Sequence, residues 1–69
     1  MHHPNIQHVM QFFGYAHLPA DLQEVSKRFA DLATFMAEDL PGNAELTAGL
    51  RKLLEAKDCA VRARLAKES

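Results

Sequence analysis

The feature that most constrains this chain is an apolar surface too wide for a two-helix hairpin to enclose. Residues 19–40 and 43–66 are predicted as two helices, because Pro41-Gly42 is a strong break between two periodic segments. A lone hairpin has one inner face, so the remaining apolar surface predicts a homo-oligomer or another partner. The first segment carries a seam spaced three and four residues apart: Leu22, Val25, Phe29, Leu32, Met36 and Leu40. The second carries two offset stripes: Leu46, Leu50, Leu53, Ala56 and Ala60, and Leu54, Val61 and Leu65.

A shorter helix is predicted over residues 5–13, where Ile6, Val9, Met10 and Phe13 fall on one helical face. Gly14 is expected to end it in a left-handed conformation, which costs glycine nothing sterically. The predicted fold is therefore all-α: one domain over residues 1–69, with a short N-terminal helix followed by a two-helix antiparallel hairpin.

Two residues are expected to shape the last helix. Asn43 is a favourable N-cap, since its side-chain oxygen can accept a backbone N–H of the first turn. Gly49 costs about 1 kcal/mol relative to alanine inside a helix, so we expect a close helix contact at that point.

The length and the cysteine content limit the class of protein. Below roughly 70–80 residues a single core rarely gives more than about 3–5 kcal/mol of stability, which again favours assembly in a chain of 69 residues. Cys59 is the only cysteine, is expected to be a small buried apolar side chain, and fits a reducing cytoplasm. The first residues are neither basic nor followed by an apolar core, so no signal peptide is expected. No apolar run approaches the roughly 20 residues of a membrane span.

The charge is close to balanced, with 8 Lys and Arg against 9 Asp and Glu and a net charge of −1. A protein that binds polymeric nucleic acid needs a basic field, so this class is disfavoured. The second long helix is mildly basic and the first is acidic. The basic helix is expected to present a solvated face or to contact the acidic one.

The sequence offers no recognisable catalytic or metal-binding pattern, and we expect neither enzyme activity nor a metal or cofactor. The histidines lack the i, i+4 pairing of a metal-binding helix face. Glu55 and Asp58 are a helical carboxylate pair, but Arg51 and Arg62 lie one turn away on either side, which favours ion pairing over acid–base catalysis. The histidines interpreted as incidental are His2, His3, His8 and His17.

Tyr15, Lys27 and Arg28 are the candidate ligand-binding residues. An aromatic ring at the entrance to the first long helix could stack on a planar base, a contact worth about 1–3 kcal/mol. Lys27 and Arg28 are the only Lys or Arg residues of the first half and could hold a phosphate. The alternative is structural: Tyr15 caps the core, and the two cations pair with Glu24 and Asp31.

Three segments of the sequence are the basis of a resemblance to a known family. They are Tyr15-Ala16-His17-Leu18 and the run from Asn43 to Ala56, together with Val61-Arg62-Ala63 near the end. These segments are similar to the anti-CBASS cyclic-oligonucleotide sponges, which share a helical hairpin domain with some Thoeris anti-defence sponges. The resemblance implies a phage-encoded homohexamer in the cytoplasm of the bacterial host. It would bind cyclic nucleotides, here cyclic dinucleotides, between protomers and hide a host immune signal without cleaving it.

The resemblance carries Tyr15 over directly, but the family's binding lysine falls at Ala30, so Lys27 or Arg28 would have to replace it. Thr47 and Arg51 on the last helix are the next candidates for the ligand site. The alternative function is a protein-interaction module, such as an antitoxin-like or adaptor hairpin that lays its apolar face on a partner protein.

Overall fold

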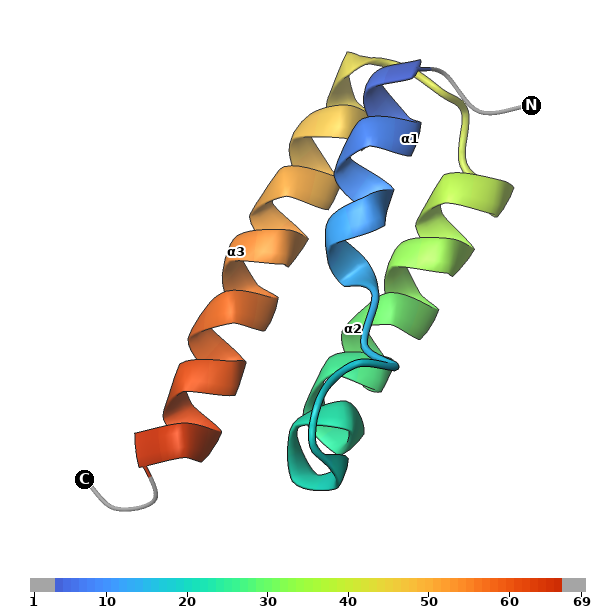
Figure 1. The fold of residues 1–69 in the computed structure, drawn as a ribbon. Helices are drawn as coiled ribbons and strands as arrows, with labels where there is room; N and C mark the ends of the chain where they lie inside the picture. Colours follow the sequence, from blue (N-terminus) through green and yellow to red (C-terminus); the bar gives the residue numbers. More distant parts are fainter. Residues whose placement is uncertain (1–3, 67–69) are drawn as a thin grey trace.

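The computed structural model describes residues 4–66, and every regular element in this range is helical (Figure 1). The first helix, α1, spans Pro4–Met10 and continues into the 3₁₀ turn η1, Gln11–Phe13. The hairpin consists of α2, Ala20–Asp39, and α3, Ala44–Ala66. The predicted all-α class and all three predicted helices are therefore confirmed, with shifts of one residue at most at the ends of the long helices.

The hairpin turn is fixed by the predicted cap. The side-chain oxygen of Asn43 accepts the backbone N–H of Leu46 at 3.0 Å, which satisfies one free donor of the first turn of α3. At the open end of the hairpin, the Arg64 guanidinium donates to the Glu24 carboxylate at 3.1 Å and to the Asp21 carbonyl at 3.3 Å. The basic last helix thus contacts the acidic α2.

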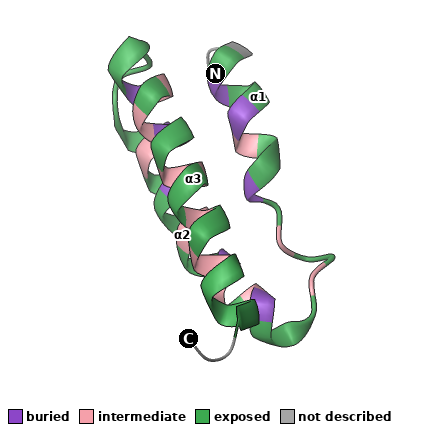
Figure 2. Cartoon of the chain, turned by 90° about the vertical axis from the view of Figure 1, so that its left-hand side faces the viewer, coloured by how far each residue is buried: buried purple, intermediate pink, exposed green. Residues whose placement is uncertain are grey.

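Helix α1 packs over the groove between α2 and α3 and covers one face of the two-helix layer (Figures 1 and 2). This packing changes the interpretation of the apolar surplus on α3. One of its two stripes faces α2, and part of the other is covered by the chain's own N-terminal helix instead of by a second copy. The buried cluster draws on all three helices and η1: Ile6, Val9, Phe13, Ala33, Ala37, Leu46 and Leu50.

The predicted seam of α2 is confirmed in part. Leu22 is buried, and the partly buried Phe29 and Met36 pack against the core. Leu32 and Leu40 were placed in the seam but are 47% and 42% exposed. The buried residues of α2 are Leu22, Ser26, Ala33 and Ala37. Because α1 lies over the groove, the face of α2 that points toward both α1 and α3 becomes the core, and small side chains there allow the close approach.

An apolar strip remains open on the flank of α2 that is turned away from α1. Leu32 and Phe35 are about half exposed and lie three residues apart, so their side chains are neighbours on the helix surface. Met36, one residue further on, packs on α3, where its Cε would be 3.3 Å from a methyl group added at Gly49. The close helix contact predicted at Gly49 is therefore confirmed.

Two local predictions are wrong. Gly14 is extended, with φ −61° and ψ 143°, because η1 has already ended the helix and the chain leaves it in an extended linker. Cys59 is exposed instead of buried, since it lies on the outward side of α3. None of the helices within residues 4–66 combines the length and the apolar character needed to cross a bilayer.

Candidate functional site

Tyr15 sits on the linker between η1 and α2, residues 14–19, which is hydrogen-bonded to the start of α2. The N–H of Leu18 donates to the Tyr15 carbonyl at 3.0 Å and closes a turn. The Gln23 side chain on α2 then donates to the Leu18 carbonyl at 2.8 Å and to the Ala16 carbonyl at 3.3 Å. Tyr15 is half-buried, so these contacts place an aromatic ring at a fixed position beside α2.

Lys27 lies on the exposed face of α2, about two turns after the start of the helix. Its ammonium group donates to Asp31 at 2.8 Å. This hydrogen bond and the Asp31 charge raise the pKa of Lys27. The predicted pairing with Asp31 is confirmed, whereas Glu24 pairs with Arg64.

Arg28 is exposed and points in a different direction from Lys27. Successive helix residues are turned by about 100°, so the two cations do not form one compact patch.

Thr47 and Arg51 lie toward the other end of the hairpin. The Thr47 hydroxyl donates to the Asn43 carbonyl at 3.3 Å, and Arg51 is exposed. Both residues flank Gly49, which lies beside Met36, and Met36 is about 13 Å further along α2 than Lys27. Within one chain, the structure does not bring this second pair to the Tyr15 site.

The histidines and the cysteine form no metal site in the part of the chain that is described, where no group of three or more potential metal ligands occurs. The His8 ring packs edge-on against Phe12, with centroids 5.6 Å apart, and lies 3.1 Å from the Gln11 amide. The Arg62 guanidinium donates a hydrogen bond to the Cys59 Sγ at 3.3 Å. His17 is in the linker, and His2 and His3 lie outside the described residues.

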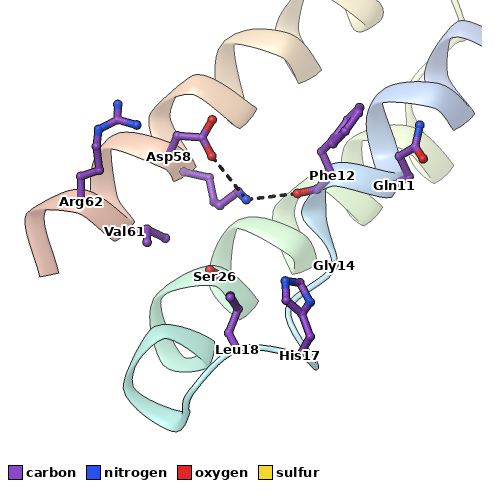
Figure 3. A pocket seen from close by; sticks show the side chains of 10 residues that line it. Gln11, Phe12, Gly14, His17, Leu18, Ser26, Asp58, Val61 and Arg62 are labelled. Atoms are coloured by element: carbon purple, nitrogen blue, oxygen red, sulfur yellow. Dashed lines mark hydrogen bonds and ion pairs between the residues drawn. The ribbon is translucent and has the colours of Figure 1, made fainter. Parts of the chain in front are cut away.

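A cavity of about 360 Å³ lies beneath the linker, between α2 and the C-terminal half of α3 (Figure 3). We call it the linker cavity. Four polar residues of the hairpin line it: Ser26 from α2, and Lys57, Asp58 and Arg62 from α3. The full lining is Gln11, Phe12, Gly14, His17, Leu18, Ser26, Lys57, Asp58, Val61 and Arg62.

Ser26 and Lys57 were not identified from the sequence, although a signal for each exists. Ser26 follows Leu22 by four residues and precedes Ala33 by seven, so helical periodicity places it on the buried face of α2. Lys57 likewise follows Leu50 by seven residues and Leu53 by four, which places a charge within the apolar stripe of α3. Polar residues in such positions either find partners or face a cavity.

No protein-family model matches this chain, and comparisons with curated proteins and with solved structures find no match. The chemistry of the described residues is therefore the basis for inferring function. Tyr15 offers a half-buried aromatic ring on the linker, and Lys27 offers an exposed ammonium group on α2. This pair suits a ligand that carries a planar ring and an anionic group.

Proposed function

We propose that this protein is a non-catalytic sponge: it binds cyclic oligonucleotides, in particular cyclic dinucleotides, at contacts between copies of the chain and withholds them from their receptors. The proposal rests on Tyr15, whose linker is hydrogen-bonded to α2, and on the exposed Lys27 ammonium group of that helix. A base stacked on Tyr15 contributes about 1–3 kcal/mol. The Lys27 ammonium group would hold a phosphate of the same ligand through a charge-assisted bond.

The ion pair between Lys27 and Asp31 is compatible with ligand binding. Its two side chains are 58% and 64% exposed, and exposed pairs of this kind contribute only about 0–1 kcal/mol. A phosphate group can therefore compete with Asp31 for the ammonium group at little cost. Arg28 is turned by about 100° around α2 from Lys27. It would therefore act at most at the edge of the site.

Assembly is part of the proposal, and two features support it. The apolar strip of Leu32 and Phe35 on α2 has no cover within residues 4–66. Thr47 and Arg51 are distant from Tyr15 in their own chain, so they would reach a ligand at that residue only from a second copy. The resemblance to anti-CBASS sponges points to a homohexamer encoded by a phage and active in the cytoplasm of its bacterial host.

The apolar strip also favours a second candidate function. A protein-interaction module would use Leu32 and Phe35 to contact a helix of another protein, as an antitoxin-like or adaptor hairpin does. Such a module would not respond to nucleotides. A thermal-shift panel of cyclic di- and trinucleotides separates the two functions, since a bound ligand stabilises a sponge by RT ln(1 + [L]/Kd), where [L] is the free ligand concentration.

Calorimetric titration with a cyclic dinucleotide tests the site itself. Tyr15→Ala is expected to weaken binding by about 1–3 kcal/mol through lost stacking, while Tyr15→Phe should keep most of the affinity. Lys27→Ala should lose a bond to a charged group worth roughly 1.5–3 kcal/mol. Arg28→Ala, at the edge of the site, should lose less, and Lys52→Ala, at an exposed position of α3, serves as the control. If the parent protein and the variants Tyr15→Ala and Lys27→Ala bind with equal affinity, the ligand site is not at the linker. Thr47 and Arg51 would then be the next residues to test.

Sequestration without cleavage is tested separately. The bound cyclic dinucleotide should be recovered intact by chromatography after the protein has been denatured by heat. Linear dinucleotide formed in proportion to protein and time would instead identify an enzyme.

A further inference from the structure

The linker cavity is separate from the site proposed for the cyclic dinucleotide. Its walls come from the linker, from α2 and from the last turns of α3 (Figure 3), and neither Tyr15 nor Lys27 lines it. Its volume of about 360 Å³ is within the usual size of small-molecule pockets. A ligand here would therefore be a second ligand of the protein.

The Ser26 hydroxyl points to a ligand in this cavity. The residue is 1% exposed, and its Oγ has no hydrogen-bond partner among the described residues. Buried hydroxyl groups are almost always paired, because burying one without a partner costs stability. Ser26 also lines the cavity, although its Oγ is recessed in the wall, so a ligand whose head reaches this oxygen would supply the missing bond.

Lys57 makes the cavity suitable for an anion. The side chain is only 13% exposed, and its ammonium group donates to the Phe12 carbonyl at 3.1 Å and pairs with the Asp58 carboxylate at 3.4 Å. An ammonium group has three donors, so one remains after these two contacts. Arg62 adds a second cation to the wall, and with neutral His17 the lining carries a net charge of +1.

The remaining wall is apolar. Phe12, Leu18 and Val61 line the cavity from η1, the linker and α3 respectively (Figure 3). We infer that the linker cavity binds a small organic anion: its carboxylate or phosphate head contacts Ser26 and Lys57, and its apolar body packs on Phe12, Leu18 and Val61. Ligands with either head share the same chemistry: one carboxylate or phosphate group attached to a compact ring or a short chain.

An amide chemical-shift titration of the isotope-labelled protein tests this inference directly. The probes are benzoate and phenyl phosphate, which distinguish the two heads, and benzyl alcohol as the uncharged control. A saturable response at millimolar concentration, centred on Leu18, Ser26, Lys57 and Val61, is expected for at least one of the two anions. Benzyl alcohol should bind at least tenfold more weakly than that anion.

Three variants locate the binding. Ser26→Ala and Lys57→Gln are each expected to weaken binding of the anion by roughly tenfold. This is the effect of losing a bond between a protein donor and a charged acceptor. Lys52→Gln, an exposed lysine of the same helix, should leave the affinity unchanged. The spectra themselves report whether each variant is folded, and Ser26→Ala decides the matter if Lys57→Gln unfolds.

Three results would overturn the inference. They are no response at the cavity amides, equal binding of benzyl alcohol, and unchanged anion affinity in Ser26→Ala. None of these results depends on whether the protein binds cyclic dinucleotides, so the failure of one proposal leaves the other standing.

Discussion

Replacing Ser26 by alanine is expected to stabilise the protein, which is unusual for a change at a fully buried position. The Ser26 Oγ is 1% exposed and lacks a partner among the described residues. Leaving such a group unpaired costs about 1–3 kcal/mol. Alanine removes the oxygen, keeps the Cβ and has a helix propensity better by up to about 0.5 kcal/mol. Allowing for the small void that is left, we expect a gain of about 1 kcal/mol in the free energy of unfolding.

Thermal unfolding followed by circular dichroism measures this effect without added ligand. For a domain of this size, 1 kcal/mol corresponds to a rise in Tm of about 4–8 °C. All proteins must be compared at one concentration, because the Tm of an oligomer depends on it. Thr34→Ala, at an exposed position of α2, controls for helix propensity alone. A Tm for Ser26→Ala below that of the parent protein would mean that the hydroxyl is already paired, and the reasoning would be refuted.

Two further changes test the packing around the linker. Lys57→Met should lower the free energy of unfolding by roughly 1–3 kcal/mol, since it removes a charged donor to the carbonyl at the end of η1. The exposed Lys52→Met should stay within about 0.5 kcal/mol in the same urea titration, and similar losses in both variants would contradict the assigned contact. Gly14→Ala should stabilise the protein by about 0.4–1 kcal/mol, because its backbone is extended and an added methyl group would meet only the Gln11 carbonyl at 3.7 Å. A lower urea midpoint for Gly14→Ala would argue against the extended linker.

The sequence was sufficient to predict the helices but not their mutual placement. Periodicity, the Asn43 cap and the Pro41-Gly42 break are local signals, and they located the elements and the hairpin turn. Which side of α2 is buried depends on where α1 packs, and this is a tertiary property. The preference for large apolar side chains therefore assigned Leu32 to the core, whereas the structure leaves Leu32 half exposed and buries Ser26.

The same limit applies to the candidate sites. Tyr15 and Lys27 are separated by one linker and about two helical turns, so their places on the linker and on the first half of α2 follow from local signals in the sequence. The linker cavity joins residues that are far apart in the chain, with Lys57 reaching the Phe12 carbonyl across 45 positions. Neither a motif nor a spacing connects such residues, and the cavity becomes visible only once α1, the linker and α3 are packed together.

Native mass spectrometry of the protein with a cyclic dinucleotide tests the central proposal most directly, because one spectrum reports both assembly and binding. The probes are cyclic di-GMP, cyclic di-AMP and cyclic GMP-AMP, with the linear dinucleotide pGpG as control. We predict ions at a multiple of the 7.7 kDa chain mass that carry intact cyclic dinucleotide, and loss of the bound ligand in Tyr15→Ala without loss of the assembly. Ions of the free 7.7 kDa chain alone, with no retained ligand from any of the three cyclic probes, would contradict the account.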